Sequence, residues 1–231
     1  MNTWVIRFAL AAICFWCFAC ADSLEGTFQP KFQLTPENEA NLQIGDVVLR
    51  RGEGRVSDFI LFGLQEDIPI SHCGFLIPAD VFKNEGIDSD VPGDSFENWG
   101  VIHAVSSGVS DFDGMQCCSL EAFLHHASND SIYVSHCLAI NESHQLRLKN
   151  RLFEILTARV PFDHGFQPYD HNEIYCSELM FMLLEEDLGL VKMSRNALKP
   201  MSHSLGFAWA FDTTQFEIAQ YKRQLIDLSA R

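Results

Sequence analysis

The stretch "IYCSEL", residues 174–179, places one cysteine at the start of a predicted helix. The preceding segment ends in the polar pair Asn172-Glu173, whereas an apolar helical pattern runs on to Leu184. A thiol in the first turn of a buried helix meets unpaired backbone N–H groups and the positive end of the helix dipole, which lower its pKa. Cys176 is therefore a candidate nucleophile. A packed core cysteine and one half of a disulfide are the alternative interpretations.

A nucleophilic thiol needs a base, and two upstream histidines could supply one. His72 opens the predicted strand "SHCGFLIP", residues 71–78, and His103 lies within "GVIHAVSSGV", residues 100–109. A histidine inside an apolar strand costs stability unless its ring nitrogens find partners. A Cys–His pair oriented by a third polar group is the arrangement that thiol catalysis requires. Each histidine taken alone is also compatible with a packed core residue.

The remaining pattern predicts a central group of strands with helices around it. Predicted strands lie at 44–52, 71–78, 100–109, 114–118 and 131–140, and predicted helices at 56–65, 120–127, 141–159 and 175–190. Residues 79–98 are rich in Asp, Asn, Gly and Pro and predict a surface loop. The final segment, 213–231, is predicted to be helical or mixed. Strands that cluster centrally indicate the α+β class.

Composition excludes some classes of partner. The chain has 231 residues, enough for one domain with a sizeable core, and a formal net charge of −15. Nucleic-acid binding needs a basic surface, so we expect no nucleic-acid partner. The acidic and histidine residues of "DHGFQPYDHNE", 163–173, are contiguous and lack the spacing of paired metal ligands. Neither a metal nor a cofactor is expected.

Residues 1–21 have the layout of an export signal. Arg7 precedes an apolar run that is too short for a comfortable membrane span, and small residues follow it. Cleavage after Ala-Cys-Ala, residues 19–21, would release a soluble exported protein. In the alternative, a lipoprotein signal ends at residue 19 and Cys20 becomes the acylated first residue. A third interpretation is that the segment is not cleaved and serves as a membrane anchor. We expect a cell-envelope protein, periplasmic or lipid-anchored, that contacts a membrane only through Cys20.

Residues 22–43 are predicted to form an extended leader, and residues 44–231 a single domain. The domain retains five cysteines: Cys73, Cys117, Cys118, Cys137 and Cys176. An odd number in an exported chain leaves at least one thiol free. Their dispersed spacing does not resemble a disulfide scaffold, although a bridge between two of them stays open.

Four motifs together resemble a known family. They are "GDVVLRRG" (45–52), "SHCGFLI" (71–77), "VIHAV" (101–105) and "YCSEL" (175–179). In this order they resemble the landmarks of the circularly permuted NlpC-type papain-like cysteine hydrolases, the YiiX/YebB-like group. The resemblance implies a permuted papain-like α+β fold with a central antiparallel sheet and helices packed around it. It also implies Cys176 as nucleophile, His72 as general base and His103 as the polar residue that orients the base, where some relatives carry a glutamate.

The resemblance also implies an activity. An exported thiol hydrolase would cleave amide or peptide bonds, with cell-wall peptides as one candidate, through an acyl-enzyme intermediate. Tyr175, Tyr169 and Asp170 are expected to contact the peptide or acyl-amide substrate at the mouth of the site. Glu178 is expected to cap the helix or to bond neighbouring loop backbone, such as residues 50–52. The alternatives are a lipid acyl hydrolase or acyltransferase, as in the related lecithin retinol acyltransferase-like enzymes, and a non-catalytic envelope lipoprotein that binds peptide or lipid.

Overall fold

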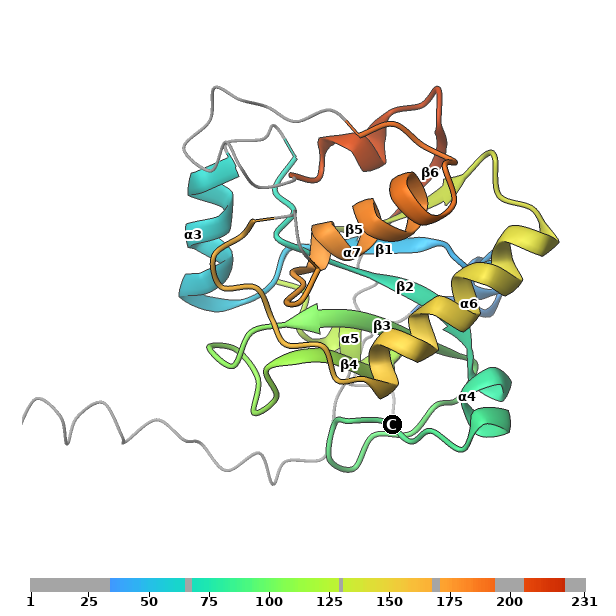
Figure 1. Ribbon diagram of the computed structural model, residues 1–231, viewed down its shortest axis with the longest axis horizontal. Coiled ribbons are helices and arrows are strands. Elements are labelled where there is room, and N and C mark those ends of the chain that lie inside the picture. The colour runs from blue at the N-terminus through green and yellow to red at the C-terminus, as the bar shows by residue number, and fades with distance from the viewer. Residues whose placement is uncertain (1–33, 65–67, 129–130, 168–170, 194–205, 223–231) are drawn as a thin grey trace, which may run out of the picture.

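The fold is built on one six-stranded antiparallel sheet (Figure 1). The computed structural model describes residues 34–64, 68–128, 131–167, 171–193 and 206–222. The strands follow the order β4-β3-β2-β1-β5-β6, and each pairs antiparallel with its neighbour. Their bounds are β1 Val47–Arg50, β2 His72–Pro78, β3 Trp99–Val105, β4 Gly114–Ser119, β5 Ser131–Cys137 and β6 Phe216–Lys222. The α+β class and the antiparallel sheet agree with the expectation.

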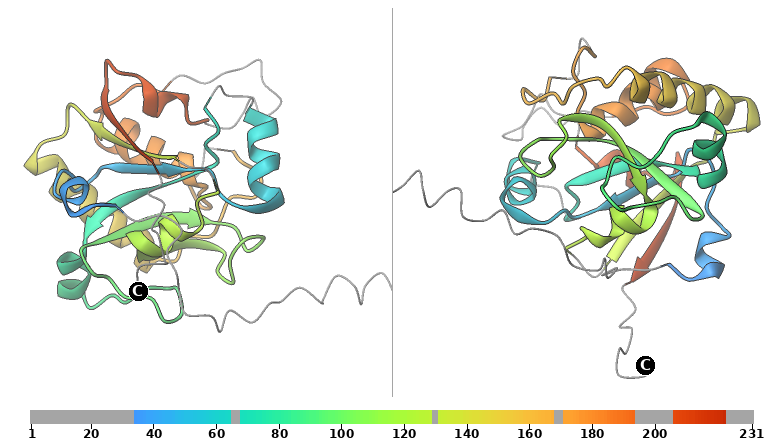
Figure 2. Two further views of the ribbon diagram at one scale, coloured as in Figure 1. Left: turned by 180° about the vertical axis from the view of Figure 1, so that it is seen from behind. Right: turned by 90° about the horizontal axis from the view of Figure 1, so that it is seen from below.

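Helices cover both faces of this sheet. Figures 1 and 2 show α6 and α7 on one face and α5 on the other. The bounds are α2 Pro36–Glu39, α3 Gly54–Leu64, α4 Ala79–Glu85, α5 Leu120–His125, α6 Glu142–Thr157 and α7 Cys176–Met180, followed by the π-helix η1 Phe181–Asp187 and the 3-10 helix η2 Ala208–Phe211. The four predicted helices are confirmed in place, and the last of them divides into an α-helical and a π-helical part.

Two apolar clusters sandwich the sheet, because successive strand residues point to opposite faces. In β1, Val47 and Leu49 join the larger cluster with α6 and α7, whereas Val48 joins the smaller cluster with α5. A strand covered on both faces reads as an apolar run rather than as a strict alternation. This explains the apolar character of the predicted strands at 71–78 and 100–109.

One short helix lies inside the predicted surface loop 79–98, and the loop prediction is wrong there. Helix α4 has no side-chain N-cap, but Gly86 ends it in the left-handed conformation, with φ 68°. Its Phe82 is fully buried and stacks on Phe96 at a centroid distance of 4.1 Å. Burial of one aromatic ring therefore stabilises a helix whose local signals are weak.

A second short helix, α2, lies inside the predicted extended leader 22–43. The Thr35 side chain accepts a hydrogen bond from the Asn38 backbone N–H at 3.2 Å, and Pro36 occupies the first helical position. A Thr-Pro pair followed by acidic residues is a helix-start signal. The prediction of an extended leader is therefore wrong at residues 36–39.

For the C-terminal segment, predicted to be helical or mixed, the helical alternative is wrong over strand β6, and residues 223–231 lie outside the described residues. This strand pairs with β5 from Phe216, opposite Cys137, to Lys222, opposite Ser131. Pairing with the open edge of β5 overrides the local preference of the segment, because strand propensity depends strongly on cross-strand context. Phe216 is buried, whereas the rest of β6 is half-buried or exposed, as befits an edge strand.

Some predictions fall outside the described residues. Residues 1–33 lie outside the described residues, and they contain the predicted signal, 1–21, with Cys20. The loop residues Tyr169 and Asp170, predicted to contact substrate, lie outside the described residues as well. Among the helices that the structure does describe, none combines the length and the apolar character needed to cross a membrane.

Candidate active site

Two histidines meet on adjacent strands. His72 is the first residue of β2, His103 lies in β3, and His72 Nε2 is 2.8 Å from His103 Nδ1. Gly74 permits this approach of β3. A Cβ atom at position 74 would lie 2.4 Å from Cγ1 of Val101 and 3.1 Å from Cβ of His103. The Ser-His-x-Gly pattern of β2 thus has a steric basis, because a side chain at position 74 would collide with β3.

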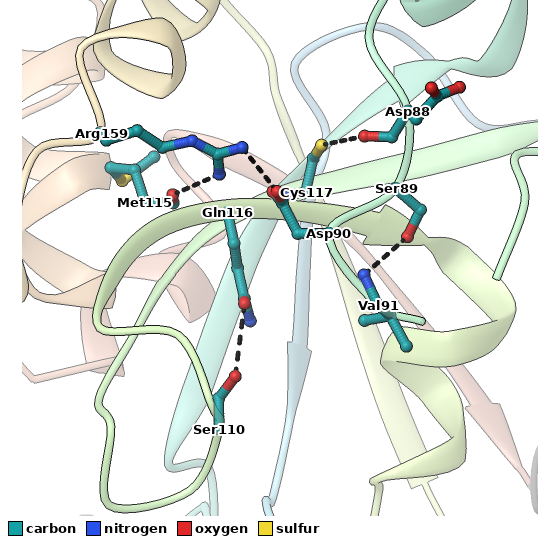
Figure 3. A network of polar contacts seen from close by, with 9 residues as sticks. All are labelled: Asp88, Ser89, Asp90, Val91, Ser110, Met115, Gln116, Cys117 and Arg159. Atoms are coloured by element: carbon teal, nitrogen blue, oxygen red, sulfur yellow. Dashed lines mark hydrogen bonds and ion pairs between the residues drawn. The ribbon is translucent and has the colours of Figure 1, made fainter. Parts of the chain in front are cut away.

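Hydrogen bonds continue from His103 to β4. Gln116 stands opposite His103 in the strand register, and its Nε2 lies 3.3 Å from His103 Nε2. Ser110 Oγ donates to Gln116 Oε1 over 3.4 Å (Figure 3). Cys118 Sγ approaches His103 Nε2 at 3.6 Å. The polar chain His72–His103–Gln116–Ser110 therefore runs from β2 through β3 and β4 to the loop between β3 and β4.

The hydrogen bonds of the polar chain can run in either of two directions. An amide nitrogen only donates, so Gln116 Nε2 makes His103 Nε2 an acceptor and leaves the His103 proton on Nδ1. His103 Nδ1 then donates to His72 Nε2, and His72 carries its own proton on Nδ1. A half-turn of the Gln116 amide reverses every bond, so that His72 Nε2 donates to His103 and His72 Nδ1 becomes an acceptor. Both directions satisfy every ring nitrogen inside the chain.

A second group of polar contacts fixes β4 from the outside. Arg159 Nη2 pairs with Asp90 Oδ1 at 2.6 Å (Figure 3). The other carboxylate oxygen of Asp90 accepts from the Cys117 N–H at 2.8 Å. Arg159 Nη1 also donates to the carbonyl of Met115 over 3.4 Å. These contacts hold the residues on either side of Gln116, so the strand that positions its amide is tied to two surrounding segments.

Phe123 of α5 supports the histidine pair. Its ring stacks on His72 at a centroid distance of 5.5 Å and meets His103 edge-on at 5.4 Å. The Arg50 guanidinium, at the end of β1, lies over the same ring with Cζ 4.6 Å from the centroid. Burial lowers the pKa of both imidazoles, that of His103 to about 3, and the Arg50 cation lowers both further. Both rings are therefore neutral at pH 7.

Cys176 begins α7 and is buried. Its pKa is lowered chiefly by a hydrogen bond from the Cys73 thiol; burial acts in the opposite direction, and backbone N–H groups of Cys73, Ser177 and Cys176 itself add to the lowering. Backbone N–H groups at the helix start thus face the sulfur. Cys73 adjoins His72 in β2, so the same contacts bring the sulfur to the strand that carries the candidate base.

The five described cysteines are all free and buried thiols. Burial raises the pKa of four of them, namely Cys73, Cys117, Cys118 and Cys137, whereas that of Cys176 is lowered. Cys176 is therefore distinguished from the other thiols by electrostatics as well as by its place at a helix start.

Glu178 fixes the start of α7. Its carboxylate accepts a hydrogen bond from the Tyr175 N–H at 3.2 Å and lies 2.9 Å from His171 Nδ1. Burial raises the pKa of Glu178 to about 7, and the hydrogen bond from His171 opposes this shift. The expected capping role is confirmed. The expected contact with residues 50–52 is wrong, because the loop partner of Glu178 is His171.

A cavity of about 360 Å³ brings the candidate groups together. His72, His103 and Cys176 all line it, as do Arg50 and Gln116. Within the described ranges no hydrogen bond joins the Cys176 sulfur to either histidine. In the same ranges His72 Nδ1 has no hydrogen-bond partner, and the His72 side chain is only partly buried. His72 Nδ1 thus has no partner among the described residues, and the His72 residue lines the cavity that Cys176 also lines.

The rest of the cavity wall is largely apolar. It includes Val56 and Ile60 of α3 and, from the loop before α7, Phe162 and Phe166. Tyr175, predicted to contact substrate, is only 2 % exposed and packs against Phe166 in the core at a centroid distance of 5.4 Å. Its side chain does not line the cavity.

Three cavity residues were not predicted from the sequence: Arg50, Gln116 and Phe123. Gln116 is a polar residue inside the short predicted strand 114–118, and Arg50 is a charge that ends an apolar strand. Both are polar or charged side chains within an otherwise apolar strand pattern, and this feature could have identified them as candidate site residues. Phe123 is one apolar residue of an ordinary amphipathic helix, and its sequence context carries no such signal.

The structure is similar to the crystal structure of the metalloprotein YiiX from Escherichia coli O157:H7 (DUF1105). The TM-score is 0.56 at 16 % sequence identity, and the match covers 78 % of this chain and 97 % of that chain. In the part of the present chain that the structure describes, no group of three or more His, Cys, Asp or Glu side chains is arranged to hold a metal ion. No protein-family model matches the sequence, and no curated protein matches it. The likeness to YiiX shows that the two chains share their fold.

Proposed function

We propose that this chain is a thiol hydrolase of the YiiX-like group, with a permuted NlpC-type papain-like fold, and that it cleaves amide or peptide bonds. One observation carries the proposal. The hydrogen-bonded pair His72–His103 lines the same cavity as Cys176, the cysteine whose pKa is lowered. A nucleophile, a base and a group that orients the base are the parts that thiol catalysis requires. The four sequence motifs that resemble this group support the same assignment.

The first chemical step uses the reversed direction of the polar chain. His72 Nδ1 accepts the Cys176 proton while the sulfur attacks the carbonyl carbon of the substrate. His72 Nε2 then donates to His103, which donates in turn to the amide oxygen of Gln116. The positive charge that forms on His72 is disfavoured by burial and by the nearby Arg50. The proton is therefore readily passed on to the leaving group.

The second step stabilises the oxyanion and resolves the intermediate. Backbone N–H groups of Cys176 and Ser177 face the reacting sulfur and are suited to bind the oxyanion of the tetrahedral intermediate. His72 protonates the departing amine, which leaves a thioester on Cys176. Water, deprotonated by His72, then attacks the thioester. The carbon–sulfur bond breaks, the Cys176 sulfur takes the proton back from His72, and the acid product is released.

Alkylation of the cysteines tests the nucleophile. In the folded protein at pH 6, iodoacetamide should label Cys176 faster than Cys73, Cys117, Cys118 or Cys137, because only the Cys176 thiol has a lowered pKa. Digestion and mass spectrometry assign the label to each site, and a Cys176→Ala variant provides the background. Equal or slower labelling of Cys176 would refute the proposed chemistry.

We also propose that the chain acts in the cell envelope, either in the periplasm or through a lipid anchor. The basis is the signal-like layout of residues 1–21, with Arg7 before an apolar run. Mass spectrometry of the purified mature protein distinguishes the forms: a diacylated Cys20 identifies the lipoprotein, and a free Asp22 the soluble form. Intact Met1 in a cytosolic fraction would contradict both.

A second candidate function is hydrolysis or transfer of a fatty-acyl group. The observation that favours it is α3, where Phe59 and Phe62 are 60 % and 71 % exposed while Val56 and Ile60 line the cavity. An exposed aromatic face beside an apolar cavity suits a lipid-like chain. Parallel assays with a fatty-acyl thioester and a peptide amide separate the two functions. A non-catalytic binding protein would hydrolyse neither and would label slowly at Cys176.

A further inference from the structure

Arg50 is a buried cation that forms no ion pair with any carboxylate of the described residues. It ends β1, stands opposite His72 in the strand register, and is only 8 % exposed where it lines the cavity. Within the described residues it forms no ion pair. Burial of an unpaired charge is unfavourable, because the charge loses its hydration. The chain has a net charge of −15, yet Glu53 is the only carboxylate on the described part of the cavity wall, and no ion pair joins it to Arg50.

Protein contacts occupy only part of the guanidinium. Nη1 donates to the carbonyl of His126, and the group lies over the ring of Phe123. Nε is buried without a hydrogen-bond partner, and among the described residues Nη2 has no acceptor either. Nε and Nη2 form one edge of the guanidinium, with two parallel N–H groups. A carboxylate accepts from such an edge with both of its oxygens.

We propose that this edge of Arg50 binds a carboxylate of the substrate, so that the cavity takes acylated amino acids or peptides with a free carboxylate near the scissile bond. The inference rests on the proposed function, because it assigns a substrate class to the same cavity. Arg50 is the only Lys or Arg on the described cavity wall, and Glu53 adds a negative charge. One cation suits a monovalent anion, and the apolar wall suits the acyl part.

The bound carboxylate also assists the chemistry. Arg50 disfavours a positive charge on His72, which stands opposite it. A carboxylate paired with Arg50 offsets this effect and makes His72 a better proton acceptor at the moment when Cys176 must lose its proton. Substrates that carry the carboxylate are therefore bound and activated by the same contact.

A pair of alkylating reagents tests the carboxylate site without a known substrate. Iodoacetate carries a carboxylate, and iodoacetamide is its neutral analogue of nearly equal size. We expect the rate ratio of iodoacetate to iodoacetamide at Cys176 to exceed the ratio for free glutathione by roughly tenfold or more, as expected for hydrogen bonds to a charged group. The rates are measured at pH 7 on the full chain.

Matched variants assign the effect to Arg50. Arg50→Gln should bring the ratio down to that of glutathione, and Arg50→Lys, which keeps the charge but not the two-donor edge, should fall between. Arg51→Gln is the control, because Arg51 is 39 % exposed and pairs with Asp58 at 2.9 Å on the surface. It removes the same charge one residue away and should leave the ratio unchanged. An equal fall in the Arg50→Gln and Arg51→Gln variants would overturn the site.

The outcomes separate the two proposals. Slow reaction of Cys176 with both reagents contradicts the proposed function, whereas fast iodoacetamide labelling with a glutathione-like ratio contradicts only the carboxylate site. If the Arg50 variants do not fold, the carboxylate site is tested on the wild-type protein, by measuring how well ligands protect Cys176 from iodoacetamide. N-octanoylglycine should protect at a concentration at least about tenfold lower than N-octanoylglycinamide. Equal protection by the two, or protection by the phosphodiester methyl octyl phosphate alone, would overturn the carboxylate assignment.

Discussion

The two ends of strand β1 treat their neighbouring histidines in opposite ways. At the Asp46 end, Asp46 Oδ1 lies 2.7 Å from His136 Nδ1 of β5, and this hydrogen bond raises the pKa of His136 although burial opposes it. At the Arg50 end, burial and the Arg50 cation lower the pKa of His72 and His103, which bond to each other. One strand thus keeps one histidine readily protonated and two neutral.

The surroundings of a histidine therefore select its role. A carboxylate partner occupies a ring nitrogen and favours the charged ring, which makes a stable structural pair. At the Arg50 end no carboxylate of the described residues binds His72 or His103, and the hydrogen bonds lead through the rings to a neutral amide. A neutral ring with a free nitrogen beside a cavity is suited to accept a proton.

The largest effect is expected for His72→Ala. Turnover of a thioester or amide substrate should fall by roughly 10²–10⁴-fold, because the general base is lost. The matched variant at the Asp46 end, His136→Ala, should leave turnover unchanged. Steady-state kinetics of both folded variants measure the contrast. An equal loss in the two variants would show that the ends of β1 do not differ in function.

His103→Ala should reduce turnover by about 10²-fold while the protein keeps near wild-type stability, because His103 acts on the orientation of His72. His103→Gln should recover part of the loss, since an amide can still bond the imidazole. The denaturant midpoint and turnover are measured on one preparation. A purely structural histidine would behave differently, with a stability loss on the order of 1–3 kcal/mol and unchanged turnover of the folded protein.

Substitution of Gln116 tests the direction of the polar chain. Gln116→Met removes the hydrogen bond to His103 and should lower turnover by roughly tenfold, the lower end of the effect of removing an outer hydrogen-bond partner. Gln116→Glu offers only acceptors, which imposes the direction that leaves His72 Nδ1 free to take a proton. It should retain activity. A glutamate variant as inactive as the methionine variant would exclude this role of the amide.

The smallest effect is expected at the Asp46 end. The pKa of His136 is raised in the folded state, so the pair contributes stability that is fully present below the ordinary histidine pKa of about 6.5 and is lost as pH rises through the folded value. His136→Gln should be less stable than wild type by about 1 kcal/mol at pH 6, and the difference should shrink at pH 9. Urea denaturation at the two pH values measures it; a difference that grows with pH would reverse the assigned sign.

Much of the frame around the site could be predicted from local patterns. The strand that begins at His72 and the helix that begins at Cys176 each lead into an apolar run, which marks the element and places its start to within one residue. Helix α4 and strand β6 could not be placed in the same way. The first depends on the burial of Phe82, and the second on the edge of β5, and neither is a local property.

The partners of the histidines could not be predicted, because they depend on strand register. Gln116 reaches His103 only because the two stand opposite each other in β3 and β4. Arg50 stands opposite His72 in β1 and β2 for the same reason. A shift of one residue in either pairing would turn these side chains to the other face of the sheet. A single sequence with no pairing information therefore points to the histidines and leaves their neighbours unmarked.

The strand order β4-β3-β2-β1-β5-β6 has a consequence for how the chain folds. Strands β1 to β4 pair in sequence order, so the half of the sheet that carries His72, His103 and Gln116 needs only short-range closures. Strand β5 must return from far along the chain to the other edge of β1, a slower event. Amides of β2 and β3 should gain protection in pulsed hydrogen exchange before those of β5 and β6. Until β5 arrives, the open edge of β1 is a template for pairing with another molecule, so refolding yield should fall as protein concentration rises.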